Sequence, residues 1–576
     1  MISDEVKSLV RKLALKNALE HDGKAKPDTV VAKIMGQKPE LRKEAKLLIN
    51  EITVIVNDVN KLSVGDQKAE LEKSAPELLI HEKKEEKSGL PPLPNAIMGA
   101  VVTRFPPEPN GYPHIGHAKA AVIDEEYAKM YDGKLILRFD DTNPLKEKIE
   151  YYDAIREGIE WLGVKPHRVK NTSDDMELLY DYAKKMIEID GAYVCTCAMD
   201  IIKENRKNGT ACGCRSNDLT HNLERWEKMF NEYKPNQAVV RYRGDMKSEN
   251  TVMRDPTLFR IIDGEHSLKG RKYRVWPTYD FAASIEDSVD GVTHAMRTKE
   301  YELRNELYYA IIDRLQIRKP LMLEFSRLEF DGMPVSKRRI KPLIDQGLVK
   351  SWDDPRLPTL AALKRRGMLP EAIREFVLTL GFTKADTKPS FDVLESINRK
   401  MIDPLSIRLF FVSNLPIISE PLVLEVSNAP KTLVKIKNHP DKDMGVREIE
   451  VKDTFYISGS DFVKLGEGSE VRLIDLYNVK IDHVKATRIS GSFNGEELKE
   501  NVPKIQWVSK DDAVQMSIMV PRALYIGEEY NQNSLEIIKG HAESYTSKLK
   551  LGDRMQFVRF GFCRIDSDGV AVLTNR

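Results

Sequence analysis

The chain has 576 residues, several times the roughly 100–200 residues of a typical domain, so we expect it to fold as about three to five units. Apolar residues make up 41% and charged residues 31%, and no apolar run approaches the roughly 20 residues that cross a bilayer, which excludes a membrane protein. The N-terminal stretch lacks the apolar core and cleavage site of a secretory signal, which predicts a cytoplasmic protein. A net charge of +1 gives no argument for a wholly basic nucleic-acid-binding surface.

The N-terminal part is predicted to be helical, because apolar residues recur at three- and four-residue steps, first near the start and again over 41–62. Gly23 is expected to end the first helix. A run of six charged residues, 82–87, is followed by SGLPPLPN, which predicts a linker near 81–96; the charged run could equally be the solvated end of a helix. The apolar face of the first helix is Val6, Leu9, Val10 and Leu13.

After the linker, the pattern predicts a strand over Ala100 to Phe105, a helix ending near Gly133 and a second strand over Lys134 to Phe139. Strand, helix, strand in this order is typical of a parallel sheet with a right-handed crossover, so a nucleotide-binding α/β domain is the leading interpretation. From about Leu422 onward, short β-branched and aromatic runs separated by Gly, Asn and Asp predict a β-barrel or sandwich.

The segment TRFPPEPNGYPHIGH, residues 103–117, carries the most chemical information. It reads as a strand exit, a proline-rich loop and a helix start, and the spacing of His114 and His117 puts both imidazoles on one side of the first helical turn. Gly116 permits a close backbone approach, and the helix N-terminus offers free N–H groups to an anion, which indicates a phosphate site. The alternatives are two surface histidines or half of a metal site.

PHIGH resembles the HIGH motif of class I aminoacyl-tRNA synthetases, and the longer stretch TRFPPEPNGYPHIGHAKAA looks like their glutaminyl and glutamyl branch. Pro334 to Arg338, PVSKR, is similar to the KMSKS loop, with Val335 replacing the usual Met and Lys337 as the key cation. The resemblance covers about residues 98–420 densely and the β-rich end more loosely. Further motifs follow in the family's order: RFDDTNP, WPTYDFA, GVTHAMRTKEY and WDDPRLPTL.

The resemblance implies a multidomain protein with an α/β Rossmann-like class I catalytic domain, an inserted acceptor-binding domain, an N-terminal α-helical region and C-terminal all-β anticodon-binding barrels. We expect the helical appendage and linker at 1–96, the nucleotide-binding fold at 97–193 and 273–345, the acceptor-end insert at 194–272, a helical stem-contact region at 346–405 and two β-barrels at 406–576.

The family's reaction implies that ATP with Mg²⁺ activates L-glutamate to glutamyl-adenylate, which then passes to the 2′-hydroxyl of the terminal adenosine of tRNA. Positioning and electrostatic stabilisation can supply most of this catalysis, because the substrates bring the nucleophile and the leaving group. By resemblance, His114, His117 and Lys337 are the catalytic residues. The residues expected to bind ATP are Glu108, Asn110, Gly116, Arg327, Leu328 and Ser336.

The choice of amino acid is expected to depend on four residues that match the family's glutamate-binding positions. Asp140 and Tyr279 match contacts of the substrate α-ammonium group. Arg297 is the decisive position, because a guanidinium pairs bidentately with the substrate γ-carboxylate, and Arg104 looks like a second cation for it. The alternative is that Arg297 forms only a structural ion pair. Asp141 is expected to be structural.

Four cysteines form two tight pairs, separated by fourteen residues, in the predicted insert. Four thiolates suit structural zinc, although the CxC spacing is tighter than the common CxxC. The alternatives are reduced cysteines at a packed turn or a degenerate site. Cys563 is expected in a core. The proposed zinc ligands are Cys195, Cys197, Cys212 and Cys214.

The resulting prediction is an archaeal-type glutamyl-tRNA synthetase that binds ATP, glutamate and tRNA(Glu). One alternative is a glutaminyl-tRNA synthetase, against which Arg297 argues, and another is a non-catalytic tRNA-binding or scaffold relative. The sequence leaves open whether tRNA(Gln) is also charged, whether activation requires bound tRNA and what residues 1–96 do. It also leaves the oligomeric state open, with a monomer as the default.

Overall fold

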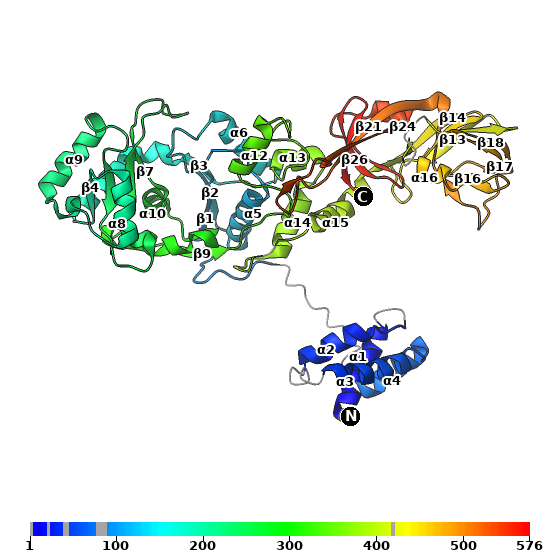
Figure 1. Ribbon diagram of the computed structural model, residues 1–576, viewed down its shortest axis with the longest axis horizontal. Coiled ribbons are helices and arrows are strands. Elements are labelled where there is room, and N and C mark those ends of the chain that lie inside the picture. Colours follow the sequence, from blue (N-terminus) through cyan, green and yellow to red (C-terminus); the bar gives the residue numbers. More distant parts are fainter. Residues whose placement is uncertain (1–3, 20–22, 38–44, 76–88, 387, 416–420) are drawn as a thin grey trace. The chain divides into compact units, whose positions relative to one another are not determined.

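The computed structural model describes residues 4–19, 23–37, 45–75, 89–386, 388–415 and 421–576. The chain divides into two units, Met1–Ser88 and Gly89–Arg576 (Figure 1). Across the described residues, no helix combines the length and the apolar character needed to cross a membrane.

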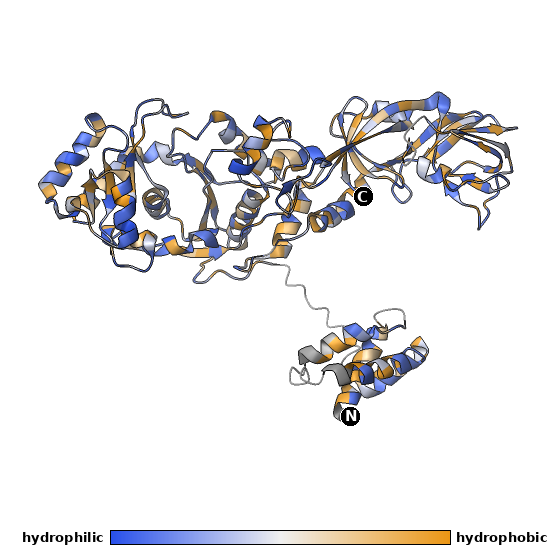
Figure 2. Ribbon diagram, in the orientation of Figure 1, coloured by the Kyte–Doolittle hydropathy of each residue, from blue (hydrophilic) through white to orange (hydrophobic). Residues whose placement is uncertain are grey.

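The first unit is helical, as predicted. Val10 and Leu13 are buried with Val6 in its core, which confirms the predicted apolar face of the first helix, and Figure 2 shows each helix carrying both apolar and hydrophilic residues. Gly23 has a φ of 84°, and its N–H donates to the carbonyl oxygen of Ala18, a closure typical of a helix end. Residues 38–44, which include the start of the second predicted helical stretch, 41–62, lie outside the described residues. The helices are α1 (Asp4–Leu19), α2 (Pro27–Gln37), α3 (Ala45–Val59) and α4 (Val64–Ser74).

The predicted linker is only partly described, since its charged run 82–87 lies outside the described residues. Leu90 and Leu93, in its second half, are each 6% exposed and pack in the main core of the second unit. The N–H of Leu93 also donates a hydrogen bond to the hydroxyl oxygen of Tyr131 at 2.8 Å. This half of the predicted linker therefore belongs to the second unit.

The predicted parallel strand–helix–strand unit is present. β1 (Val102–Phe105) pairs in parallel with β2 (Lys134–Phe139), which pairs in parallel with β3 (Arg168–Asn171), and α5 (Ile115–Met130) connects the first two strands. The next helix is α6 (Ile149–Trp161).

The second half of this fold contains the parallel pair β8 (His294–Thr298) and β9 (Leu321–Phe325). The N–H of Thr293 donates to the carbonyl oxygen of Val102 at 2.9 Å, which brings β8 beside β1. The two halves of the fold therefore meet across a long insertion. Between β8 and β9 lie η6 (Lys299–Arg304) and α11 (Asn305–Leu315).

The insertion is built on an antiparallel sheet with the strand order β4-β5-β6-β7. Its strands and helices share a core that includes Trp226, Phe259 and Trp276. Its elements are η3 (Thr172–Asp175), α7 (Met176–Glu188), β4 (Ala192–Cys195), α8 (Met199–Asn208), η4 (Gly213–Ser216), α9 (Leu219–Asn231), β5 (Val239–Tyr242), η5 (Thr251–Met253), β6 (Thr257–Ile261), β7 (Val275–Pro277) and α10 (Tyr279–Val289).

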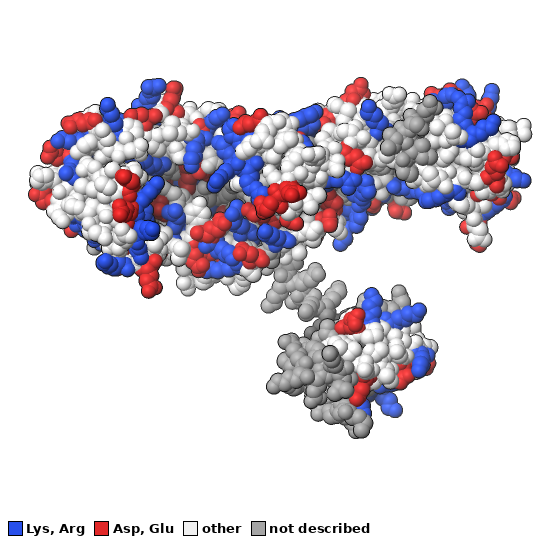
Figure 3. All heavy atoms as spheres, in the orientation of Figure 1, with Lys and Arg blue, Asp and Glu red and all other residues white. Residues whose placement is uncertain are grey.

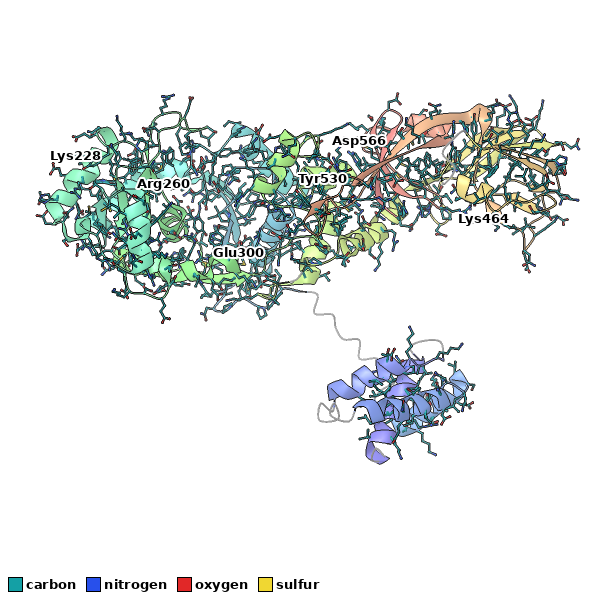
Figure 4. All side chains as sticks on the ribbon, viewed as in Figure 1. Lys228, Arg260, Glu300, Lys464, Tyr530 and Asp566 are labelled. Atoms are coloured by element: carbon teal, nitrogen blue, oxygen red, sulfur yellow. The ribbon has the colours of Figure 1, made fainter. Side chains whose placement is uncertain are left out.

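Helices follow β9. α12 begins at Lys337, inside the PVSKR segment. Arg365 in α13 pairs with Asp566 of the β-rich end, the residue labelled in Figure 4, at an N–O distance of 2.7 Å. The helices are α12 (Lys337–Asp345), α13 (Leu360–Arg366), α14 (Pro370–Leu380), α15 (Phe391–Ile402) and η7 (Asp403–Leu405).

The C-terminal part is β-rich, as predicted, and contains two seven-stranded sheets. One has the order β10-β25-β26-β27-β21-β24-β11. The other has the order β19-β16-β17-β18-β12-β15-β20, and its strands come, in sequence, between β11 and β21 of the first sheet. Cys563 is 1% exposed in the first sheet's core, which confirms its prediction. The elements are β10 (Ile407–Leu409), β11 (Phe411–Ser413), β12 (Val423–Ser427), β13 (Thr432–Lys437), β14 (Val446–Val451), β15 (Thr454–Ile457), α16 (Gly459–Phe462), β16 (Glu470–Leu473), β17 (Asn478–Lys485), β18 (Arg488–Phe493), β19 (Lys504–Ile505), β20 (Trp507–Ser509), η8 (Lys510–Asp512), β21 (Ala513–Pro521), β22 (Tyr525–Ile526), β23 (Glu529–Tyr530), β24 (Leu535–Glu543), η9 (Ser544–Lys548), β25 (Arg554–Phe557), β26 (Gly561–Ser567) and β27 (Val570–Asn575).

Candidate active site

A cavity of about 890 Å³ lies between the strand ends of the α/β fold, the start of α5, the start of α12 and the insertion. Every residue predicted to act on ATP or the amino acid lines it, although motifs more than 200 residues apart supply them. These lining residues are Arg104, Glu108, Asn110, His114, Gly116, His117, Asp140, Tyr279, Arg297, Arg327, Leu328, Ser336 and Lys337.

The two histidines close the first turn of α5. His114 is the N-cap residue, and its Nδ1 accepts the N–H of Gly116 at 3.1 Å. Nδ1 of His117 accepts the backbone N–H of His114 at 3.2 Å, and the ring centroids lie 4.0 Å apart. The prediction that both imidazoles share one side of this turn is confirmed.

Both rings are neutral N–H donors. Desolvation lowers the pKa of His117 to about 4 and that of His114 well below its ordinary range. Because each Nδ1 accepts a backbone N–H, the ring proton lies on Nε2. The turn therefore offers two Nε2–H donors, each oriented by the backbone, to an anion in the cavity.

Gly116 is required by close packing at this turn. A Cβ added at position 116 would meet Cε1 of the His114 ring at 2.9 Å and the carbonyl oxygen of Leu328 at 3.4 Å. The first of these distances is shorter than real Cβ contacts, so a larger residue would displace the imidazole.

Lys337 is the first residue of α12, after the N-cap residue Ser336, whose side chain makes no capping hydrogen bond. Its Nζ lies 4.7 Å from the centroid of the Tyr151 ring. Desolvation lowers the pKa of Lys337, and the nearby charge of Lys148 lowers it further. The ammonium group is thus a cation in a positively charged surrounding, which favours an anionic ligand.

Asp140, which is predicted to contact the substrate α-ammonium group, lines the cavity. Its Oδ1 accepts a hydrogen bond from Nε of Arg138 at 3.1 Å and another from the hydroxyl of Thr172 at 3.2 Å. Desolvation raises the pKa of Asp140, although the nearby charge of Arg138 acts to lower it. The neighbouring Asp141 is fully buried and accepts hydrogen bonds from Ser173, which agrees with the structural role expected for it.

The two arginines predicted to bind the substrate carboxylate differ in their partners. Arg104 is 1% exposed and pairs with Asp287, from Nε at 3.1 Å and from Nη2 at 3.3 Å. Its charge is already balanced inside the protein, so its role toward a substrate stays a prediction. Arg297 donates from Nη2 to Oδ1 of Asn305, and within the described part of the chain it forms no ion pair with a carboxylate.

The remaining predicted residues complete the cavity wall. Tyr279 begins α10, and its ring lies 5.2 Å from that of Tyr301 between centroids. Arg327 is exposed and pairs with Glu300 at 2.7 Å, so its side chain is directed to the protein surface. That orientation is compatible with the predicted adenine contact, which uses its backbone.

Sequence reasoning missed the basic residues that the insertion and η6 add to the cavity: Arg206, Arg260 and Arg304. Arg304 pairs with Asp280, whereas Nε of Arg206 is buried without a hydrogen-bond partner. Figure 4 labels Arg260, in β6 of the insertion, and Figure 3 shows lysine and arginine side chains gathered around the hollow between the insertion and α12. No motif signalled them: Arg206 and Arg304 stand among other charged residues, and Arg260 is a lone arginine in an apolar strand.

The four predicted zinc ligands come together at the end of β4 and the start of η4, with all their Sγ atoms within 4.8 Å of one another. The Cys195 and Cys212 sulfurs are 3.7 Å apart, and those of Cys197 and Cys214 are 3.8 Å apart. A tetrahedral zinc with Zn–S bonds of about 2.3 Å has S···S edges of about 3.8 Å, so the cluster fits this ion. The Arg241 guanidinium lies 3.7 Å from Cys212 Sγ and favours a thiolate there.

Known proteins resemble this chain over its whole length. A model of the tRNA synthetases class I (E and Q) catalytic domain matches residues 100–404, and two models of their anti-codon binding domain match 406–498 and 504–566. The glutamate–tRNA ligase of Nitrosopumilus maritimus is 51% identical and covers 100% of both chains. That of Pyrococcus furiosus is 42% identical and covers 98% of this chain and 97% of its own. A solved glutamate tRNA ligase of Elizabethkingia meningosepticum, in complex with its amino acid, is 21% identical, with a TM-score of 0.39 over 53% of this chain and 70% of its own.

Proposed function

The chain belongs to the class I tRNA synthetases for glutamate and glutamine, and from this premise we propose that it is a glutamate–tRNA ligase. It uses ATP to convert L-glutamate to glutamyl-adenylate and transfers the glutamyl group to the 2′-hydroxyl of the terminal adenosine of tRNA(Glu). The observation that carries the choice of glutamate is Arg297, a cavity-lining guanidinium that no carboxylate of the described residues neutralises.

The phosphates of ATP bind between the starts of α5 and α12. The Nε2–H groups of His114 and His117 donate to α-phosphate oxygens as negative charge develops there, and Lys337 pairs with the β- and γ-phosphates. The two imidazole rings do not have to move to act, because backbone N–H groups already orient them. Glu108, Asn110, Gly116 and Ser336 line the nucleotide site, and the backbone of Arg327 and Leu328 meets the adenine.

Glutamate binds at the other end of the cavity. Asp140 and Tyr279 contact its α-ammonium group, and Arg297 pairs with its γ-carboxylate. A hydrogen bond to a charged group contributes about 1.5–3 kcal/mol, whereas the neutral amide of glutamine would leave part of the guanidinium unpaired. This difference favours glutamate.

Two metals accompany the proposal. Mg²⁺ would be carried by the ATP phosphates, where it neutralises charge. Zinc would be held by Cys195, Cys197, Cys212 and Cys214 and would cross-link β4 to η4. We expect about one zinc per chain in protein purified without added metal. A metal-free preparation that is stable and active would contradict the zinc assignment.

Charging assays test the function. Glutamate-dependent exchange of pyrophosphate into ATP is measured with tRNA present, and glutamine is compared with glutamate. Preference for glutamine would support the glutaminyl alternative, and failure to form any aminoacyl-tRNA would support a non-catalytic relative. Parallel charging of tRNA(Glu) and tRNA(Gln) determines whether the ligase accepts both.

Arg297→Cys tests the residue that carries the choice. The variant is expected to lose glutamate activity by about 100-fold and to gain tolerance of glutamine, because the γ-carboxylate loses its counter-charge. Unchanged selectivity would remove Arg297 from this role.

A further inference from the structure

Arg297 lies directly opposite a carboxylate and yet does not pair with it. β8 and β9 run in parallel with Arg297 and Glu324 as Cα partners, an arrangement in which arginine and glutamate ordinarily attract. Glu324 is 8% exposed, so the attraction would be poorly screened. Neither carboxylate oxygen of Glu324 is within ion-pair distance of Arg297.

The side chain of Asn305, the first residue of α11, lies between them. Its Oδ1 accepts a hydrogen bond from Nη2 of Arg297, and its Nδ2 donates to Oε1 of Glu324. Because a carboxylate only accepts hydrogen bonds, Glu324 fixes the amide so that the oxygen faces the guanidinium. Arg297 is thus oriented by a neutral acceptor.

The charge of Glu324 is balanced by another residue. Its Oε2 lies 2.9 Å from Nζ of Lys384, which also contacts Glu302 at 2.9 Å. Beneath Arg297, the Tyr308 ring lies 5.4 Å from the guanidinium carbon and adds no full charge. The positive charge of Arg297 therefore remains available to the cavity, whereas that of Arg104 is taken by Asp287.

We propose that Asn305, supported by Lys384, is a positioning residue that holds Arg297 in place while keeping Glu324 from neutralising it. The inference rests on the proposed function and deepens it: selection of glutamate depends on an arginine whose internal partner is an amide. A carboxylate at position 305 would form the internal ion pair that the native arrangement avoids, and glutamate would have to displace it.

Asn305→Asp tests this with almost no change in shape. With saturating ATP and tRNA in the exchange assay, KM for glutamate is expected to rise about 10- to 100-fold, while KM for ATP stays unchanged. The ratio of kcat/KM for glutamate to that for glutamine is expected to fall as KM for glutamate rises. Asn438→Asp is the matched control, because Asn438 also accepts from a buried arginine, Arg447, in the β-rich part, so the same chemical change there leaves both values unaltered.

Lys384→Met provides a second variant, since this side chain is half exposed and its loss does not threaten folding. Removing its charge leaves Glu324 unbalanced and is expected to raise KM for glutamate about threefold. Lys319→Met, which breaks the exposed pair with Asp313, is its control.

Unchanged KM for glutamate and unchanged selectivity in both variants would overturn the inference. Should Asn305→Asp fail to fold, an unchanged Lys384→Met would still overturn it. The proposed function fails separately: the unmodified enzyme would then show no exchange with glutamate, whatever the variants do.

Discussion

Two of the helix starts that border the cavity, those of α5 and α12, are built differently. At α5, the side chains of His114 and His117 accept backbone N–H groups and keep fixed donors for the cavity. At α12, Ser336 caps nothing, and Lys337 contributes a half-buried ammonium over the Tyr151 ring. The first start is preorganised and neutral; the second is charged and held by few contacts. Each should therefore respond to substitution in its own way.

The largest effect is expected from the double variant His114→Ala and His117→Ala. Loss of both Nε2–H donors should lower kcat for exchange by about 1,000-fold or more, because preorganised donors act where charge develops. The helix also loses its cap, which costs about 1 kcal/mol of unfolding free energy. Kinetics and denaturant unfolding measure both. His167→Ala is the control, since His167 also accepts a backbone N–H through Nδ1 but does not line the cavity.

Lys337→Met is expected to come next, with a loss of about 100-fold in kcat/KM for ATP. The unfolding free energy should stay the same, because the ammonium makes no ion pair among the described residues. Lys341→Met on the same helix, which removes only the exposed pair with Asp345, should leave activity intact. A Lys337 variant that has a lower unfolding free energy but normal activity would show that Lys337 stabilises the fold and does not act on ATP.

Gly116→Ala should lower kcat about tenfold, because the new Cβ pushes the His114 ring from its place. Gly111→Ala is the matched change at the α12 side, where the added Cβ would meet Lys337 at an ordinary 3.7 Å. Equal effects of the two substitutions would mean that the α5 turn is no more tightly built than its counterpart.

The smallest effect concerns pH. His117 has a pKa of about 4 in the folded protein, below its ordinary value, so its contribution to stability is fully present above about pH 6.5 and is lost as the pH falls toward 4. At pH 5.5 the loss is about 1 kcal/mol relative to pH 7. Unfolding of His117→Gln should lack this part of the pH dependence. An identical pH profile in the variant would contradict the neutral imidazole.

Local patterns predicted most of the fold, and the residues predicted to act on ATP and the amino acid line one cavity. The helix at His114, the strand over Lys134 to Phe139 and the β-rich end follow from periodicity and turn residues that act over short distances. The motif residues lie at strand ends and helix starts, which a parallel fold gathers at one edge of its sheet.

Ion pairs and hydrogen bonds between residues far apart in the chain could not be predicted from these local patterns. Arg104 and Asp287 are separated by 183 positions, and no local sequence pattern near either residue indicates that they pair. Asn305 stands outside the recognised motifs, and its importance appears only when β8, β9 and α11 are packed together. Leu90 and Leu93 read as linker because their flanking prolines and charges dominate the local composition.

The hydrogen bond between Thr293 and Val102 joins residues 191 positions apart. During synthesis, β1 must therefore wait for its neighbour β8 until the whole insertion has left the ribosome. The core of the insertion is completed later still, because it includes Leu307, Ile311 and Leu315 of α11. A nascent chain that stalls before Thr293 would expose an unpaired β1 edge, which is open to pairing with another chain.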